Sequence, residues 1–372
     1  MGNRKLHIVA LDVPFPADYG GAIDMYYRIK ALHELGLELT LHVFEYGRGQ
    51  QPELEKFGKV YYYKRTRSVF HFFSKRPFVV QSRLSKQLLE TLRKDNDPIL
   101  MEGLHTSGIL EDNAISQRLT FVRMHNIEHE YYSELAQNSG LLKRIFFHRE
   151  AIKLKRYLGI LKKAKFILAI KESDREWFEK INPSSLLLPA CSEFPTFAPE
   201  KTQPFALFHG NLSVPENENA AFWLIESLRK EVDSEFPLVI AGKNPSSKLM
   251  NACDGTFVKL IPNPTKNALN NLIESAQIHV FYSEAPSGVK LKLLNVLGTS
   301  GHILCNENMI GQKGLADICT IENEPPAFAK RFVELKNMLP HHINFEHRKS
   351  FISENLDASK HCKIIKDIID ET

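Results

Sequence analysis

The stretch LHIVALDVPFPADYGGAIDMYYRIKALHELGLELTLHVF, residues 6–44, holds two short apolar runs separated by a glycine turn and an amphipathic segment. The runs at 6–13 and 38–44 have the composition and length of β-strands. Residues 22–35 between them place apolar side chains at helical spacing. Alternation of strand and helix predicts a parallel sheet that is covered on both faces, and therefore an α/β fold.

The same alternation runs outward from this stretch along the whole chain. Further strands are expected in the first half at 59–64, 98–105, 119–125, 166–171 and 185–189, with a helical pattern at 82–92. Prolines then interrupt the pattern at Pro195, Pro199 and Pro204. In the second half, strands are expected at 205–210, 238–242, 257–261, 278–282, 302–306 and 318–321, with helices at 217–231, 266–275 and 289–297.

The chain is thus expected to form two tandem Rossmann-like domains. At 372 residues with 43% hydrophobic content it can bury two cores. The expected parts are a first domain at 1–190, a linker at 191–204, a second domain at 205–350 and a C-terminal helical segment at 351–372 that returns to the first domain. Ligands of such folds bind outside the carboxyl ends of the strands, which predicts a cleft between the domains.

Composition excludes several classes of protein. No apolar run approaches the roughly 20 residues that span a bilayer, and residues 1–13 are interpreted as a first strand and not as a secretion signal. The five cysteines are scattered, so neither a disulfide framework nor a zinc site is expected. A reducing, cytoplasmic compartment is the expectation.

Positive charge is concentrated in the first half of the chain. Residues 1–200 hold 30 Lys and Arg against 24 Asp and Glu, and the rest holds 18 against 20. The segment 56–89 holds nine basic residues and no acid, interleaved with aromatic residues. The segment 143–165 holds nine basic residues and one acid, Glu150. The stretch 56–89 is either a basic flank with core aromatics or a peripheral contact with anionic lipid at the inner face of the membrane. Nucleic-acid binding is not expected, because the overall charge of +4 is modest and no reading motif is present.

Candidate site residues of the first half follow its strands. Gly20 and Gly21 open the helix after the first strand, where the backbone can approach a phosphate or a sugar hydroxyl, or simply turn. His125 and Asn126 follow the strand at 119–125, and an imidazole there could bond a sugar hydroxyl or move a proton. Two more polar side chains, Glu102 and His105, end the preceding strand and share this edge; they are either acceptor contacts or ordinary loop residues.

Candidate residues of the second half are mainly cationic. Lys243 ends the strand at 238–242, and Lys290 and Lys292 lie at the start of the expected helix at 289–297, after Ser287 and Gly288. Ammonium groups beside a helix N-terminus could form a cradle for a diphosphate. Two surface lysines at the solvent-exposed start of a helix would give the same sequence pattern. No G-x-G-x-x-G, H-E-x-x-H, G-x-S-x-G, P-loop or kinase signature is present.

In their order along the chain, these segments resemble glycosyltransferase family 4. The resemblance rests on PFPADYGGA (14–22), RMHNIEHEYYSELA (123–136), FHGNLSVPENENAAFWL (208–224), VIAGKNP (239–245), SGVKLKLLNVLGTSGHIL (287–304) and GQKGLA (311–316). It covers nearly the whole chain. It implies the GT-B fold, no obligatory metal or other cofactor, a nucleoside-diphosphate sugar as donor held mainly by the second domain, and transfer with retention of anomeric configuration.

The resemblance also assigns residues. It implies that Gly20 and Gly21 lie beside donor phosphate or acceptor, that His125 is a catalytic residue near the transferred sugar, and that Lys292 contacts the diphosphate. On the donor side it adds Gly210, Asn211 and the position of Asn295. Two glutamates of the family, spaced E-x7-E, fall here on Ser287 and Asn295. The amide oxygen of asparagine still accepts hydrogen bonds, but without charge. The arginine and lysine of the usual phosphate-binding pair are replaced near Asn211 and Glu216.

Three functions remain open on the sequence. The leading one is a glycosyltransferase that moves a sugar to a glycan or lipid-linked acceptor, as in surface polysaccharide or glycoconjugate biosynthesis. The second is a catalytically degenerate GT-B protein that binds or scaffolds, which the replacement at Asn295 favours. The third is a nucleotide-sugar epimerase, which requires several cleft carboxylates; Glu102, Glu128 and Glu284 are the candidates.

Overall fold

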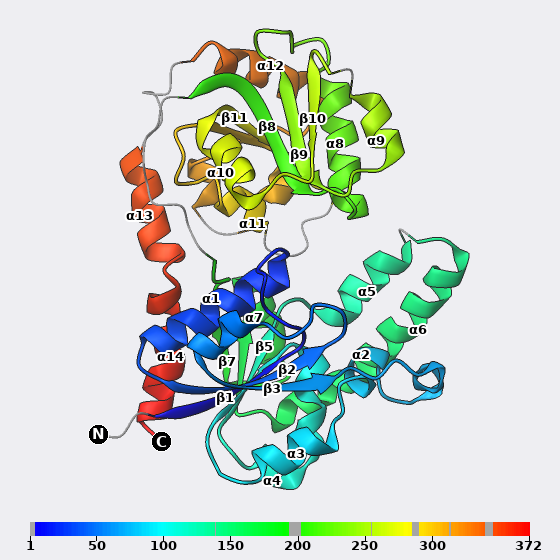
Figure 1. The fold of residues 1–372 in the computed structure, drawn as a ribbon, viewed down its shortest axis with the longest axis vertical. Helices are drawn as coiled ribbons and strands as arrows, with labels where there is room; N and C mark the ends of the chain where they lie inside the picture. Colours follow the sequence, from blue (N-terminus) through cyan, green and yellow to red (C-terminus); the bar gives the residue numbers. More distant parts are fainter. Residues whose placement is uncertain are drawn as a thin grey trace. The chain divides into compact units, whose positions relative to one another are not determined.

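The computed structural model describes residues 4–137, 139–192, 202–253, 255–284, 290–311, 314–338 and 345–372. The chain divides into two compact units (Figure 1). Unit 1 comprises Met1–Ser192 and Asp357–Thr372, and unit 2 comprises Glu193–Leu356. The C-terminal segment therefore joins unit 1 from Asp357 onward, whereas Phe351 belongs to unit 2.

Unit 1 is built on a seven-stranded sheet in the order β3-β2-β1-β4-β5-β6-β7. Every neighbouring pair in this sheet is parallel. The central strands are buried along almost their whole length, as expected for a sheet with both faces covered. The strands are β1 (Lys5–Ala10), β2 (Glu38–Glu45), β3 (Gly58–Lys64), β4 (Ile99–Glu102), β5 (Thr120–Met124), β6 (Phe166–Ala169) and β7 (Ser185–Leu187).

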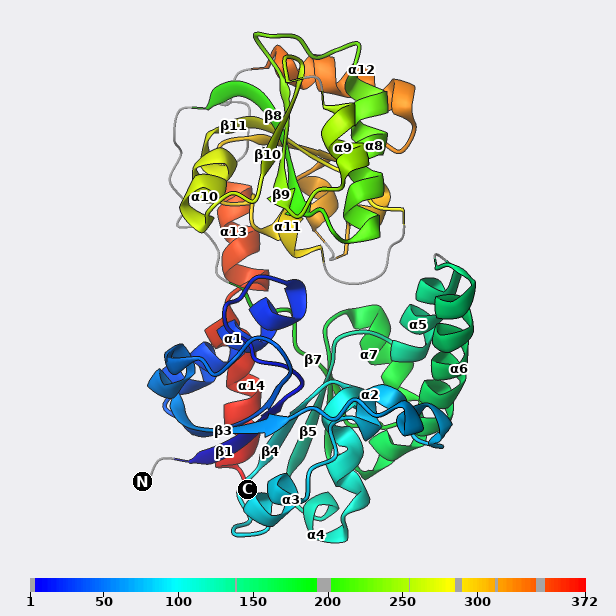
Figure 2. The same cartoon turned by 45° about the vertical axis from the view of Figure 1, so that its right-hand side comes forward.

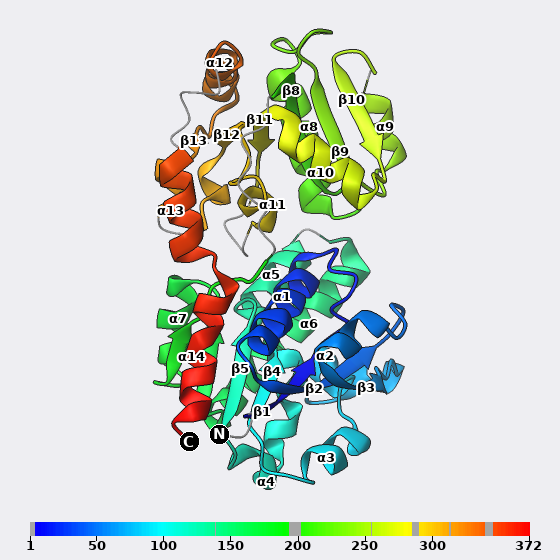
Figure 3. The same ribbon diagram turned by 60° about the vertical axis from the view of Figure 1, so that its left-hand side comes forward.

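Two hydrophobic layers cover the faces of this sheet. On one face, Leu6 and Ile8 of β1 pack with Met25 and Ile29 of helix α1, and the C-terminal helix α14 completes this layer. On the other face, Val9 packs with side chains of α2, α3, α6 and α7. Figures 1 and 3 show α14 beside α1. The helices are α1 (Gly20–Glu34), η1 (Pro52–Lys56), η2 (Val69–Phe73), α2 (Phe78–Gln81), α3 (Lys86–Leu92), η3 (Leu104–Glu111), α4 (Asn113–Ser116), α5 (Glu128–Gln137), α6 (Leu141–Tyr157), η4 (Leu158–Lys163), α7 (Glu172–Glu179) and α14 (Ala358–Asp370).

Unit 2 repeats this strand order on a six-stranded parallel sheet, β10-β9-β8-β11-β12-β13. Figure 2 shows helices α8 and α9 on one side of this sheet and α10 on the other. The strands are β8 (Gln203–Asn211), β9 (Leu238–Lys243), β10 (Val258–Pro262), β11 (Ala276–Phe281), β12 (His302–Cys305) and β13 (Thr320–Ile321). The helices are α8 (Pro215–Leu228), α9 (Ser247–Ala252), α10 (Lys266–Ser275), α11 (Leu291–Leu294), η5 (Glu307–Met309), η6 (Leu315–Asp317), α12 (Pro325–Lys336) and α13 (Phe345–Asn355).

Each expected strand is present, with ends displaced by up to three residues, and the α/β fold class is confirmed. Three expected helices differ. The pattern at 82–92 forms a helix only at α3 (Lys86–Leu92), because the side chain of Ser85 accepts a hydrogen bond from the amide of Leu88 and caps the helix there. The C-terminal pattern at 351–369 breaks at Asp357, whose carboxylate caps α14. Among the described residues no helix is long and apolar enough to cross a membrane.

The third difference concerns the predicted diphosphate cradle. The helix expected at 289–297 is reduced to α11, which covers only Leu291–Leu294, and the chain continues from Asn295 in turns. Lys290 is its N-terminal cap residue with φ −86° and ψ 69°, and its side chain caps no backbone amide. The dipole of a one-turn helix is small. The expected contribution of a helix N-terminus to anion binding at this position was therefore wrong.

Candidate active site

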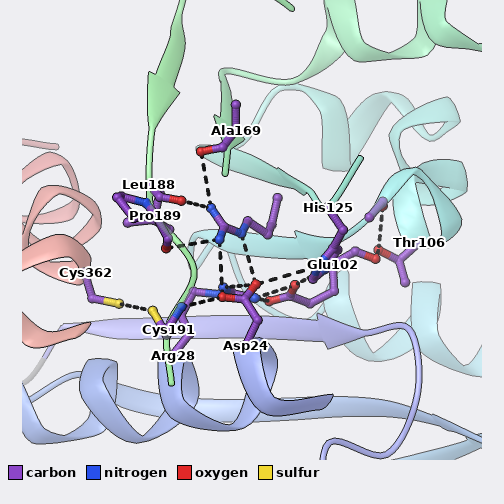
Figure 4. Close-up of polar contacts among 12 residues, drawn as sticks. Asp24, Arg28, Glu102, Thr106, His125, Ala169, Leu188, Pro189, Cys191 and Cys362 are labelled. Atoms are coloured by element: carbon purple, nitrogen blue, oxygen red, sulfur yellow. Dashed lines mark hydrogen bonds and ion pairs between the residues drawn. The ribbon is translucent and has the colours of Figure 1, made fainter. Parts of the chain in front are cut away.

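The carboxyl edge of the unit 1 sheet holds a buried network of charged side chains (Figure 4). Arg28 of α1 donates from Nε and Nη2 to the carboxylate of Glu102, the last residue of β4, at 2.6–3.1 Å. Its Nη1 donates to Asp24, one turn earlier on the same helix, at 2.7 Å. Arg28 and Glu102 are both 0% exposed. The i,i+4 spacing on α1 thus turns an acid and a base inward to meet the end of β4.

Arg123 of β5 balances the second acid of this network. Its Nε and Nη2 lie 3.2 Å from the carboxylate oxygens of Asp24. It also donates to the carbonyl oxygens of Leu188 and Pro189, where the chain leaves β7. The backbone amide of Cys191 donates to Asp24 at 2.7 Å. The two acids and two arginines have no net charge as a group. They join α1, β4 and β5 to the segment 188–191 that follows β7.

His125, the residue after β5, lies between the two acids. Its Nε2 is hydrogen-bonded to Glu102 at 3.1 Å, and its Nδ1 lies 3.6 Å from Asp24, beyond hydrogen-bond distance. Burial opposes ionisation of both acids, but the two arginines hold the pKa of Asp24 below its ordinary value, and Arg28 and His125 do the same for Glu102. Both acids therefore stay ionised at neutral pH, and they fix the imidazole ring at the sheet edge.

A second polar group lies on the same edge. Nδ1 of His105 lies 3.8 Å from Glu128 at the start of α5, and no described residue is hydrogen-bonded to it. Burial raises the pKa of Glu128 to about 7, although Arg83 opposes this. Burial, Arg83 and His125 keep the pKa of His105 well below its ordinary value. Near neutral pH this group therefore holds a neutral imidazole beside a carboxyl that is ionised only in part.

The remaining unit 1 candidates lie at the same edge without specific contacts of their own. Gly20 is the first residue of α1, and a side chain at Gly21 would meet the Tyr19 ring at 3.1 Å. Tyr19 in turn donates its hydroxyl to Asp12, which follows β1, at 2.8 Å. Asn126, next to His125, is half-buried.

In unit 2, two lysines meet one acid and one amide at the carboxyl edge of the sheet. Lys290 donates to Glu216 at 2.6 Å, and Ser283 donates to the same oxygen at 2.6 Å. Lys292 donates to Oδ1 of Asn217 at 2.8 Å and lies 5.0 Å above the ring of Phe208. Glu216 and Asn217 belong to the first turn of α8, so this helix and the chain around α11 are joined through side chains.

The electrostatics of this group favour a net positive charge. Although burial opposes it, Lys290 and Ser283 hold the pKa of Glu216 below its ordinary value. Burial lowers the pKa of Lys292 to about 8, with Glu216 acting in the opposite direction. Two ammonium groups against one carboxylate leave an excess of one positive charge at pH 7, which suits an anionic ligand.

The other donor-side candidates surround this group or lie outside the described residues. Asn217 also donates to the carbonyl oxygen of Asn211 at 2.9 Å, and a side chain added at Gly210 would meet Asn217 at 3.3 Å. Lys243 ends β9 and pairs in register with Asn211. Asn295 caps the C-terminus of α11 through its backbone amide. Ser287 and Gly288 lie outside the described residues.

The structure brings the sequence candidates together in two sets. His125, Glu102 and His105 share the edge of unit 1, and Lys290, Lys292, Gly210 and Asn211 share the edge of unit 2. Sequence reasoning missed Asp24, Arg28, Asn217 and the ion-pair roles of Arg123 and Glu216. The sequence did offer one indication of this network, which is the spacing of Asp24 and Arg28 on an otherwise apolar helix face. Charged side chains that point into a protein core require oppositely charged partners there.

One group within the described part of the chain has the geometry of a metal site, and it lies elsewhere. His7, Asp95 and Asp97 are within reach of one ion. The positions that an ion would use are taken, because Asp95 is hydrogen-bonded to His7 at 3.1 Å and to Arg118 at 2.9 Å. His7 lies near the start of β1, away from the carboxyl edge. These residues do not fit a metal-dependent active site.

Comparisons with known proteins bear on the fold. No protein-family model matches the chain. An uncharacterized 44.6 kDa protein in the cps region of Klebsiella pneumoniae is 28% identical over 388 residues, covering 96% of this chain and 97% of that protein.

Solved structures match over the full length of the chain. The sucrose-phosphate synthase of Thermosynechococcus elongatus has a TM-score of 0.71 at 10% identity, covering 99% of each chain. The UDP-forming trehalose-phosphate synthase of Burkholderia xenovorans with glucose-6-phosphate has 0.68 at 11%, covering 99% and 100%. HepE of Anabaena in complex with UDP and glucose has 0.67 at 10%, covering all of both chains. The two-domain α/β fold of this chain is the fold of these structures.

Proposed function

We propose that this chain is a glycosyltransferase that moves a sugar from a nucleoside-diphosphate sugar to a glycan or lipid-linked acceptor, with retention of anomeric configuration. The observation that carries the proposal is the likeness over 99–100% of the chain to a UDP-forming synthase and to a protein bound to UDP and glucose. The relative in a cps region supports a place in surface polysaccharide or glycoconjugate biosynthesis.

Unit 2 supplies the donor side in this proposal. The bond between the anomeric carbon and the diphosphate oxygen breaks, and the nucleoside diphosphate leaves with the electron pair. Lys290 and Lys292 carry the excess positive charge that stabilises this leaving group, and no metal ion is required. Asn217 holds the Lys292 ammonium group at 2.8 Å, so the charge is oriented before the ligand arrives. Lys243, Asn211 and Asn295 complete the donor side.

Unit 1 supplies the acceptor side. The acceptor hydroxyl oxygen forms the new bond to the anomeric carbon, and its proton passes to the oxygen of the departing diphosphate. The ring of His125, held by Glu102 and Asp24, positions the sugar and the acceptor with the loop at Gly20 and Gly21. A buried, balanced ion network keeps this ring in one orientation without placing a net charge beside the sugar.

Hydrolysis of donor across a panel of nucleotide sugars tests this function. We expect one donor to be turned over, and Lys292→Met to lower the rate by tenfold or more, because one charge-assisted contact to the leaving group is lost. Lys248→Met is the matched control, since Lys248 is an exposed lysine of unit 2 that stacks on Phe222. A panel without any turnover would contradict the proposal and favour a scaffold. Turnover at equal rates in both variants would contradict the role of Lys292 at the leaving group.

We also propose that unit 1 rests on an anionic membrane surface. Large apolar side chains of η2 and α6 are exposed, namely Phe70 (77%), Phe73 (76%), Leu141 (73%) and Leu142 (83%). The two elements touch, because the ring of Phe72 lies 6.3 Å from that of Phe146 and Lys153 donates to the carbonyl oxygen of Phe72. The basic stretch at 143–165 lies mainly on α6 and on η4, which follows it. Apolar tips with surrounding cations match a lipid surface with negative head groups.

Co-sedimentation with phosphatidylglycerol vesicles tests this contact. We expect Leu142→Ser with Phe73→Ser to abolish most of the binding, and Met338→Ser, an exposed apolar residue of unit 2, to leave it unchanged. Binding that is equal in all variants would contradict the surface. A cytoplasmic location at the inner face of the membrane is part of the same proposal, and the five cysteines, which lie in the described part of the chain and form no disulfide there, are consistent with it.

A further inference from the structure

Three arginines gather around one tyrosine ring in unit 1. The guanidinium carbons of Arg65, Arg67 and Arg83 lie 4.4, 5.0 and 5.7 Å from the centroid of the Tyr46 ring. Tyr46 is the first residue after β2, and Arg65 is the first residue after β3. The register of these strands pairs Glu45 with Lys64, so both residues emerge side by side at the carboxyl edge.

Arg83 is fixed within this group, which we call the arginine cluster. It is 3% exposed, and it donates from Nε to the carbonyl oxygen of Leu11 at 2.7 Å and from Nη1 to that of Val79 at 2.9 Å. Leu11 follows β1, so the cluster spans the ends of β1, β2 and β3. Arg65 donates from Nε to the hydroxyl of Ser82 at 3.1 Å. The guanidinium groups are thus held by neutral acceptors and by a ring.

No ion pair in the described part of the chain involves any of these three arginines. Arg48, one loop away, differs in this respect because it pairs with Asp18 at 2.8 Å. The acids that face the cluster are Asp12 and Glu128. Asp12 accepts from the hydroxyl of Tyr19 and from the amide of Val13, both at 2.8 Å, and burial raises the pKa of Glu128 to about 7. Positive charge therefore exceeds negative charge here.

A buried charge without a carboxylate partner is costly, and here like charges crowd it further. Burial and the neighbouring Arg65 lower the pKa of Arg83 to about 10. The ring of Tyr46 offsets only part of this cost, since a cation–π contact is weaker than an ion pair. An independent sign of a missing ligand is Nδ1 of His105, which is buried and has no hydrogen-bond partner in the described part of the chain. The positive charges of Arg83 and Arg65 both act to lower the pKa of this histidine.

We propose that the arginine cluster binds a phosphate group of the acceptor, so that the acceptor is a phosphate or diphosphate ester. Arginine forks match phosphate oxygens in pairs, and three guanidinium groups against one tyrosine ring supply the charge that a doubly charged group requires. The cluster lies at the same sheet edge as His125, where ligands of parallel sheets bind. A phosphate on the cluster would place the attached sugar along that edge. That this phosphate belongs to an acceptor rests on the proposed glycosyltransferase function. That the arginine cluster binds phosphate does not depend on that function.

Calorimetric titration of the full chain with inorganic phosphate and with inorganic pyrophosphate tests the site. We expect binding that Arg67→Gln and Arg65→Gln each weaken tenfold or more, because each removes one charged donor. Arg331→Gln is the matched control: Arg331 is an arginine of unit 2 paired with Glu334 at 2.6 Å, and its loss should change affinity less than twofold. Arg67 is exposed and makes only the ring contact, so Arg67→Gln tests the site without disturbing the fold. Stronger binding of pyrophosphate than of phosphate assigns a diphosphate acceptor, and the reverse assigns a monophosphate.

Several results would overturn the proposal. They are the absence of binding at 10 mM of either probe, equal weakening by Arg331→Gln, or displacement of bound phosphate by UDP, which would assign the cluster to the donor. Loss of vesicle binding in Arg67→Gln with phosphate binding intact would assign it to the membrane. Phosphate binding in a chain that turns over no donor would refute the proposed function alone, and donor turnover without phosphate binding would refute this inference alone.

Discussion

The two units carry the same strand order but differ in the charge around their central site residues, His125 in unit 1 and Lys292 in unit 2. Unit 1 buries two acids and two arginines in a balanced network around His125. Unit 2 places two lysines against one acid and keeps an excess of positive charge. A parallel sheet therefore fixes only where a site lies, and the side chains that follow each strand decide whether that site orients a neutral group or attracts an anion.

The largest expected effect tests whether the buried network of two acids and two arginines stabilises unit 1. We expect Arg28→Met to lower the free energy of unfolding of unit 1 by about 3–5 kcal/mol, because it leaves Glu102 buried without its main partner. The chain has two tryptophans, Trp177 in unit 1 and Trp223 in unit 2. Urea unfolding followed by Trp177 fluorescence in a Trp223→Phe background therefore reports on unit 1.

Lys30→Met is the control for this experiment. Lys30 lies on the same helix and makes a wide contact of 3.9 Å with Glu34 at the surface, so its loss should cost less than about 0.5 kcal/mol. Equal losses in Arg28→Met and Lys30→Met would show that the network does not stabilise unit 1.

The next effect concerns Glu128, the buried acid beside His105 in unit 1. Burial raises the pKa of Glu128 from 4.5 to about 7, so ionisation of this group favours the unfolded chain. Its stabilising effect is complete below pH 4.5 and is lost as the pH rises through about 7. We expect Glu128→Gln to be the more stable protein at pH 8, by roughly 3 kcal/mol at most, and to match wild type near pH 4. Parallel stability curves of the two proteins between pH 4 and pH 8, measured with the same Trp177 reporter, would contradict the burial argument.

The smallest expected effect concerns unit 2 and is the pH dependence of its affinity for UDP. Because burial lowers the pKa of Lys292 to about 8, its positive charge is present below pH 8 and is lost above it. We expect the affinity for UDP to fall severalfold between pH 7 and pH 9.5 in wild type, and to be lower but flat with pH in Lys292→Met. Isothermal titration at both pH values checks this. An identical pH dependence in the variant would assign the titration to another group.

Much of the fold could be predicted from the sequence, and the reasons are local. Strands such as Ile99–Glu102 are short, apolar and bounded by turns, so their presence is readable even where their ends are not. The helix expected at 289–297 failed because apolar spacing continues through Leu293 and Leu297 while the chain forms turns after Leu294. Periodicity reports burial, and a buried turn gives the same pattern.

The site could be predicted only in its outline. His125 and Lys292 were found because each follows a strand or a turn in a recognisable segment. Asp24 and Arg28 were missed because their partners Glu102 and Arg123 lie 74 and 99 residues away in the sequence. The arginine cluster was seen only as part of a basic stretch, since nothing in the sequence shows that Arg65 and Arg83 share one tyrosine ring. Pairing across strands is a tertiary property, and composition does not contain it.

Hydrogen–deuterium exchange with and without UDP tests the central claim, that unit 2 holds the donor diphosphate, most directly. Bound ligand slows exchange of the amides it covers, so we expect protection around 208–217 and 290–296 in wild type and its loss in Lys292→Met. Protection confined to unit 1, or protection that persists unchanged in Lys292→Met, would contradict the claim.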